Sequence, residues 1–81
     1  MNLYLISQTE VDGYDTYSDA VVAAKTPKEA STFHPGGGDK LPRDDASGTW
    51  TNDPAKVSVS LIGRAIKGMP AGVVCASFHA G

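Results

Sequence analysis

Apolar residues gather in four short runs along the chain, and polar stretches rich in glycine and aspartate separate these runs. Each run is five or six residues long, which is typical of a β-strand and short for a helix that must be stable by itself. The pattern therefore predicts four strands, at residues 2–7, 20–24, 57–62 and 73–78. For the second run a helix is the alternative, because the periodicity of apolar residues does not distinguish a strand from a helix in so short a segment.

The predicted strands differ in how their side chains alternate. In residues 57–62 apolar and polar positions alternate, so we expect Val57, Val59 and Leu61 to be buried on one face of a sheet. The first and last strands carry apolar groups at both odd and even positions, which predicts that both of their faces are covered. The first two strands can pair as an antiparallel hairpin, with residues 9–19 as a turn-rich connection.

One short helix is predicted between the second and third strands. Thr26, Pro27 and Glu29 have the spacing of a capping box, with the proline at the first helical position. The helix must end soon afterwards, because His34 precedes a proline and three glycines follow. These signals place the helix at about residues 27–34.

A long polar stretch, residues 35–56, lies between this helix and the third strand. It contains four glycines and three prolines, and its only large apolar residues are Leu41 and Trp50. A connection of this length is usually either functional or disordered. We expect it to be more mobile than the sheet, apart from Trp50, because few apolar groups offset the entropy of ordering it.

These elements predict a single α+β domain spanning residues 1–81, with element order β-β-α-β-β. The sheet would be four-stranded and mostly antiparallel, with the one short helix on one face and the long Gly/Pro-rich loop beside it. One short helix covers only one face, whereas the first and last strands are apolar on both. The second face therefore needs another cover, either the loop at 35–56 folding back with Trp50 or a second protein chain.

Charge is small in total, at −2, and uneven along the chain. The seven basic residues are spread singly after residue 24, so no basic patch of the kind that binds nucleic acid directly is predicted. The first 24 residues carry no basic group but four acidic ones, Glu10, Asp12, Asp15 and Asp19. This segment can attract a basic partner surface, and the alternative is a solvated turn.

Three aromatic residues fall within the predicted connections, namely Tyr14, Tyr17 and Trp50. Exposed aromatic side chains in loops are the type that anchors protein interfaces. The alternative is that they pack inward and fix the loops to the core. The candidate partner-binding residues are therefore Glu10, Asp12, Tyr14, Asp15, Tyr17, Asp19 and Trp50.

The sequence contains no motif that indicates catalysis, a cofactor or a metal. Cys75 and His79 lie about 13 Å apart along one strand, too far to share an ion or to act as a nucleophile and its base. Residues 12–19 lack the ligand spacing of a calcium loop, and the glycines at 36–38 lack the following Lys-Ser/Thr of a phosphate loop. We expect no catalytic residue, cofactor or metal, and a buried, unreactive Cys75.

The cysteine count and the length of the apolar runs indicate where in the cell the protein is found. A single cysteine forms no internal disulfide, which favours a reducing compartment. No apolar run approaches the roughly 18 residues of a membrane span. We therefore expect a soluble cytoplasmic protein that does not contact a membrane.

Segments at both ends of the chain resemble a group of small phage and prophage-encoded proteins of unknown function. The resemblance covers Leu3–Gln8, Tyr14–Ala24, His34–Pro35 and Gly72–Gly81, whereas residues 36–55 lie outside it. It implies a mobile-element setting in a bacterial host, where short acidic proteins often act by binding a host protein. Anti-defence inhibitors, including anti-CRISPR proteins, are similar in size and charge.

The resemblance and the acidic segment together predict a non-enzymatic protein that inhibits a host defence machine by occluding a basic nucleic-acid-binding surface. The expected partner is a host protein or nucleoprotein complex. Two other functions stay open: a small-molecule-binding or minor enzymatic accessory protein, and a homodimeric structural accessory protein.

Overall fold

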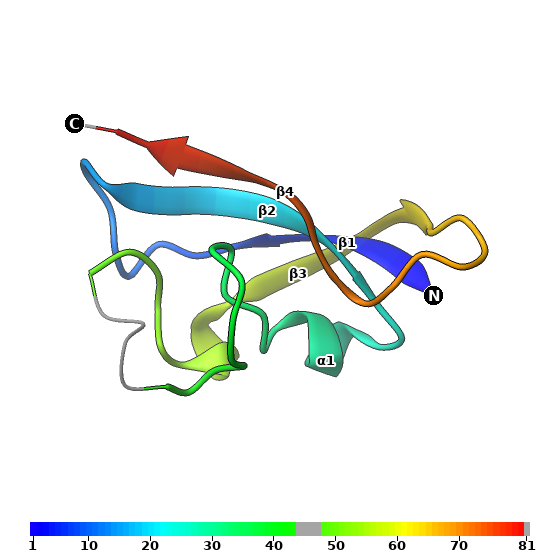
Figure 1. Ribbon diagram of the computed structural model, residues 1–81. Coiled ribbons are helices and arrows are strands. Elements are labelled where there is room, and N and C mark those ends of the chain that lie inside the picture. Colours follow the sequence, from blue (N-terminus) through cyan, green and yellow to red (C-terminus); the bar gives the residue numbers. More distant parts are fainter. Residues whose placement is uncertain (44–47, 81) are drawn as a thin grey trace.

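The computed structural model describes residues 1–43 and 48–80. Four strands and one short helix account for its regular structure, together with a 3-10 turn at Pro54–Lys56 (Figure 1). The elements are β1 (Asn2–Ser7), β2 (Thr16–Ala24), α1 (Pro27–Ala30), β3 (Ser58–Arg64) and β4 (Gly72–His79). The four strands lie where the apolar runs predicted them, in the expected order.

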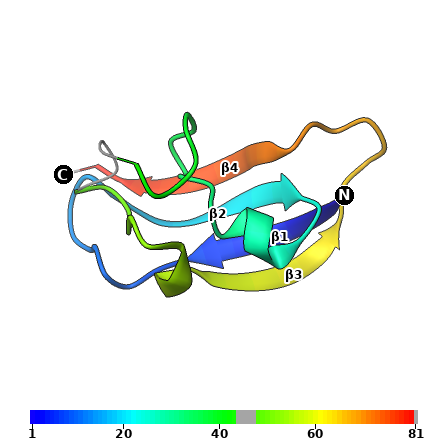
Figure 2. The same cartoon turned by 90° about the horizontal axis from the view of Figure 1, so that it is seen from below.

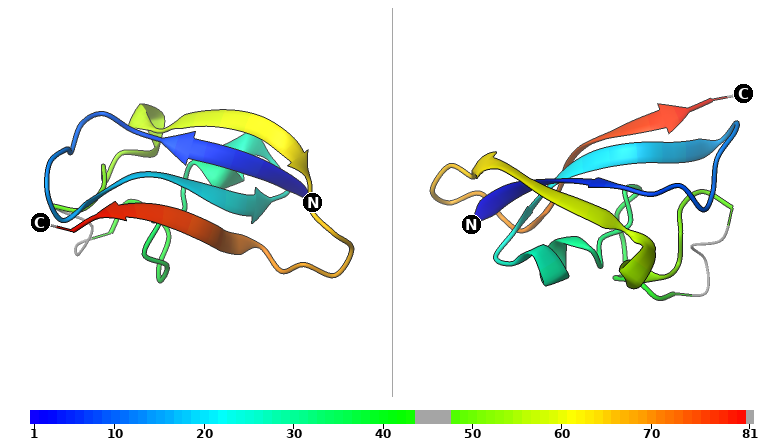
Figure 3. Two further views of the ribbon diagram at one scale, coloured as in Figure 1. Left: turned by 90° about the horizontal axis from the view of Figure 1, so that it is seen from above. Right: turned by 180° about the vertical axis from the view of Figure 1, so that it is seen from behind.

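The strands form one antiparallel sheet in the order β3-β1-β2-β4. β1 and β2 pair as the predicted hairpin, with Leu5 opposite Val21. β3 adds to the outer side of β1 and β4 to the outer side of β2. Residues 65–71 therefore cross the end of the sheet from one edge to the other (Figure 3). Because α1 is only four residues long, the fold is mostly β rather than an even mixture of helix and sheet.

The cap of α1 forms as predicted, although the helix is shorter than expected. Thr26 Oγ1 accepts a hydrogen bond of 3.1 Å from the Glu29 N–H. The Glu29 carboxylate accepts from the Lys25 N–H at 2.9 Å, one residue before the usual partner in a capping box. The helix ends at Ala30 rather than near residue 34, and a turn follows it.

One face of the sheet carries the whole core. α1 and the described part of the 35–56 loop lie on the same side of the sheet (Figures 1 and 2). Both large apolar residues of that loop, Leu41 and Trp50, are buried there. The loop does fold back, as one of the two expectations had it, but it covers the same face as the helix. The greater mobility expected of this loop stays a prediction, and residues 44–47 lie outside the described residues.

The opposite face of the sheet is open. None of the described segments passes over the strands when this side is viewed (Figure 3, left). The prediction that β1 and β4 are covered on both faces is therefore wrong: Leu5 is 37% exposed, and β4 is exposed from Val74 to His79. Within β3, Val59 is half-buried but Leu61 is 65% exposed, because β3 is an edge strand and its register shifts at that point.

The predicted burial of Cys75 is also wrong, since its side chain is exposed. Its apolar neighbours in the sequence suggested a strand in the middle of a sheet. β4 is instead an edge strand, and Cys75 stands opposite Val21 of β2 on the open face. Sequence position alone does not reveal which strand becomes an edge.

β2 begins at Thr16, four residues before the predicted start. The extension forms because Thr16 and Tyr17 pair with His79 and Phe78 of β4. The connection between β1 and β2 is therefore residues 8–15 rather than 9–19, and Asp19 belongs to a strand. None of the described helices is long and apolar enough to cross a membrane.

Candidate functional site

Residues 8–15 connect β1 to β2 and form the acidic tip, the name used here for this segment. Gln8 holds its first half in place with a buried side chain. The Gln8 amide donates to the Val11 carbonyl at 2.7 Å and accepts from the Val11 N–H at 2.9 Å. This two-way bond closes a turn around Glu10, so the first half of the tip is not a loose coil.

The second half of the tip is fixed by bonds to its neighbours. The Thr16 hydroxyl donates to the Gly13 carbonyl at 2.8 Å, and the Asp15 N–H donates to the His79 carbonyl of β4. Gly13 and Asp15 both have positive φ, at 95° and 60°, a conformation that glycine and aspartate tolerate best. Tyr14 lies between them with 81% of its surface exposed. The backbone thus holds an aromatic ring outward.

The charge of the tip is largely exposed. Glu10, Asp12 and Asp15 are all exposed side chains. Glu10 accepts a hydrogen bond of 2.7 Å from the hydroxyl of Thr51, a buried residue of the long loop. In the described ranges 1–43 and 48–80, Glu10 and Asp12 form no ion pair within 4 Å. Their negative charge is therefore not neutralised locally.

The other three predicted partner-binding residues lie elsewhere. Tyr17 is half-buried: its ring meets the His34 ring edge-on with centroids 5.8 Å apart and lies 4.8 Å from the Phe78 ring. Trp50 is 1% exposed and belongs to the core. These two residues follow the packing alternative. Asp19 lies on the open face of the sheet, so the structure brings together only Glu10, Asp12, Tyr14 and Asp15.

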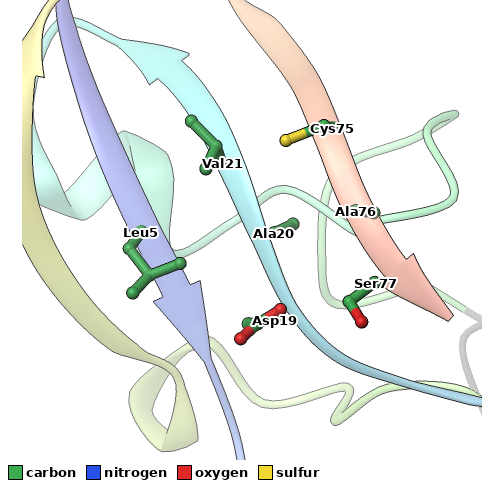
Figure 4. Close-up of a pocket in the computed structure, with 7 residues that line it drawn as sticks. All are labelled: Leu5, Asp19, Ala20, Val21, Cys75, Ala76 and Ser77. Atoms are coloured by element: carbon green, nitrogen blue, oxygen red, sulfur yellow. The ribbon is translucent and has the colours of Figure 1, made fainter. Parts of the chain in front are cut away.

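A shallow hollow of about 170 Å³ on the open face has Asp19 among its lining residues. Figure 4 shows the side chains of Leu5, Val21 and Cys75 along this hollow. Ser77 of β4 faces the carboxylate of Asp19 on β2 (Figure 4). The sequence did not indicate this hollow, because it depends on β4 lying next to β2. Its walls are low, and its apolar part is one row of three side chains.

The end of the molecule opposite the tip carries basic residues. Lys25 follows the last residue of β2, Arg64 is opposite Asn2 at the end of β3, and Lys67 lies in the crossing connection. We call these three residues the basic end. The molecule is 36 Å along its longest axis, and Figure 1 shows the hairpin tip at one end and the N-terminus with the crossing connection at the other. Although the net charge of the chain is only −2, its two ends therefore carry charges of opposite sign.

The described residues contain no group of three or more histidine, cysteine or acidic side chains that could hold a metal ion. Comparison of the chain with protein-family models, curated proteins and solved structures found no match. The chemistry of the surface is therefore what indicates a function. The clearest arrangement on it is an exposed aromatic ring held among carboxylates.

Proposed function

We propose that this protein is a non-enzymatic binding protein that docks its acidic tip on a basic surface of a partner protein. The observation that supports this most is Tyr14, an 81% exposed ring between acidic residues on a hydrogen-bonded turn. Tyrosine is among the residues that most often dominate binding energy at interfaces. Its ring fills a pocket on the partner, while its hydroxyl finds a polar neighbour.

Two further features favour the tip over other surfaces. The bonds of Gln8 and Thr16 hold the turn before any partner arrives, which lowers the entropy lost on binding. The carboxylates of Glu10 and Asp12 are exposed, and they attract a basic surface and speed the encounter. Tyr14 accordingly controls dissociation, and the carboxylates control association.

The partner that we propose is a host defence complex of the CRISPR effector type, bound on a surface that otherwise contacts nucleic acid. Such surfaces are basic because they neutralise phosphates, and carboxylates can occupy the same lysine and arginine groups. The support for this partner is the resemblance to phage-encoded proteins together with the acidic tip. Binding there would exclude the nucleic acid by direct competition.

The test is a purified CRISPR effector complex assayed for nucleic-acid binding with and without the protein. We expect the parent protein to release the nucleic acid. Tyr14→Ala should weaken binding by about 30-fold, the equivalent of about 2 kcal/mol. The matched control is Ile62→Ala, which removes a 53% exposed apolar side chain from β3, at the sheet edge away from β4, and should change nothing.

The proposed effect of the tip carboxylates on association is tested with a separate control variant. Asp12→Asn should slow association at low salt and have little effect on it at high salt. Asp39→Asn changes another exposed aspartate, in a different loop, and should not alter the association rate. If the tip variants bind and inhibit as well as the parent at every salt concentration, the acidic tip is not the interface. If the parent leaves nucleic-acid binding by every effector tested unchanged, the proposed partner is wrong.

A further inference from the structure

β4 is a strand with almost no cover. It lies at one edge of the sheet, with β2 on one side and no described strand on the other. Its side chains are exposed from Val74 to His79, including Phe78 at 46%. Only Val73 of this strand packs against the core. Its outer backbone edge pairs with no described strand, and its side chains on both faces are exposed from Val74 onward. The loop after α1 reaches past this edge on the helix side of the sheet, whereas the other side is open (Figure 3, left).

The composition of β4 offers little protection against pairing. Natural edge strands are usually guarded by charged residues, by proline or by a bulge. Residues 72–78 contain neither a charged residue nor a proline. The pairing of β4 with β2 shifts register twice, at Val74 and again between Ser77 and Phe78. Cys75, Ala76 and Ser77 pair regularly between the two shifts. These three central residues therefore form a short regular edge with which no described strand pairs.

We propose that β4 pairs with β4 of a second copy of this chain, antiparallel and about a twofold axis, to form a continuous eight-stranded sheet. Such a twofold interface is the commonest in soluble homo-oligomers, because the same surface serves both partners. In this arrangement the axis passes close to Cys75 or Ala76, the middle of the strand. The helices of the two copies lie on the same side of the joined sheet.

Charge complementarity is what favours a second copy over an unrelated strand. The end of β4 touches the acidic tip, through the bond from the Asp15 N–H to the His79 carbonyl. The start of β4 follows the connection that contains Lys67. Antiparallel pairing therefore places the acidic tip of each copy beside the connection of the other that carries Lys67. An extended peptide from another protein would gain the backbone hydrogen bonds but not this match at both ends.

The expected affinity is modest. Pairing along a single strand of eight residues buries less area than a standard interface, so we expect a Kd on the order of micromolar. The equilibrium is measured by sedimentation across concentrations on both sides of that value. The mass should rise from the 8.4 kDa of one chain to twice that figure. Added salt should shift the equilibrium toward the monomer, because the ends attract each other electrostatically.

Cys75 provides a direct probe of the geometry, since it is exposed and is the only cysteine of the chain. With the twofold axis at Cys75 or Ala76, the two thiol-bearing residues lie within about 8 Å of each other across the pair. A short bis-maleimide should therefore link two copies efficiently at dimer concentrations, and Cys75→Ser should abolish the link without changing the mass at equilibrium.

The decisive variants are Cys75→Lys and Ser60→Lys. Both positions are exposed and stand in the same row across the sheet, in register with Leu5 and Val21, but on opposite edges. Cys75→Lys brings two like charges together at the axis and should weaken the dimer about tenfold or more, whereas Ser60→Lys should leave it unchanged. Native Trp50 fluorescence, from a buried ring, confirms that each variant is folded.

Three outcomes would overturn the proposal. One is a monomer at every concentration. Another is a dimer lost in Ser60→Lys but kept in Cys75→Lys, which assigns the pairing to β3. The third is a dimer that withstands both changes and forms no Cys75 link, which assigns the contact to another surface.

Discussion

Trp50 is the largest fully buried side chain of the described residues, and its replacement measures how far the long loop stabilises the sheet. The ring is 1% exposed and packs in one cluster with Tyr4, Ile6 and Leu41. Truncating such a residue to alanine removes buried apolar area and leaves a cavity, at a cost of about 3–5 kcal/mol. A chain of 81 residues has a total stability of about 4–12 kcal/mol. Trp50→Ala should therefore remove a large part of it.

Trp50→Phe separates the contribution of the ring from that of its N–H group. The indole Nε1 is buried and has no hydrogen-bond acceptor among the described residues. A buried donor without an acceptor costs about 1–3 kcal/mol, and phenylalanine removes that donor while keeping most of the apolar area. The two effects oppose each other, so Trp50→Phe should cost less than about 1.5 kcal/mol.

Urea denaturation followed by far-UV circular dichroism measures both variants, since neither retains the tryptophan signal. The exposed Tyr14→Ala variant is the control and should lie within about 0.5 kcal/mol of the parent. If Trp50→Ala unfolds at the urea concentration of the parent, the loop does not cover the sheet. If Trp50→Phe is as costly as Trp50→Ala, the N–H group is bonded in solution and the assignment of the stability to ring burial is wrong.

Two further predictions concern α1 and β4. Thr26→Ala removes the acceptor of the 3.1 Å bond from the Glu29 N–H and should cost about 1 kcal/mol in the same assay, whereas Thr9→Ala, an exposed threonine in the acidic tip, should leave the midpoint unchanged. An unaltered midpoint for Thr26→Ala would show that the cap does not stabilise the native state. The Cys75 thiol is exposed, so a thiol reagent should label the native protein, at concentrations where it is monomeric, about as fast as the urea-unfolded chain. Labelling many times slower in the native state would show that this part of β4 is covered.

The positions of the strands could be predicted because clustered valine, isoleucine and leucine residues leave few alternatives. The ends of elements were less predictable, since they depend on bonds between distant or polar groups. α1 stops early because the Ser31 and Thr32 hydroxyls donate to the Lys28 and Glu29 carbonyls, at 2.7 and 2.6 Å, and compete with further helical bonds. β2 starts early because β4, more than fifty residues later, supplies the partner for Thr16 and Tyr17.

The candidate site was predictable only where it is local. Glu10, Asp12, Tyr14 and Asp15 lie together because they share one short connection. Whether Tyr17 and Trp50 are exposed depends on contacts across the fold, such as the one between the Tyr17 and His34 rings. The open edge of β4 depends on strand order, which hydrophobic pattern does not encode.

The small share of β4 in the core has a consequence for partial unfolding. Among the residues that pack in or against the core cluster, Val73 is the one that β4 supplies, whereas Tyr4, Val22 and Trp50 belong to other segments. Proteins open locally where few buried apolar contacts hold a segment. β4 can thus detach from β2 while β1, β2 and β3 stay closed over Trp50. The backbone amides of β4 should therefore exchange with solvent through local opening, whereas those of the central strand β1 require more of the sheet to open.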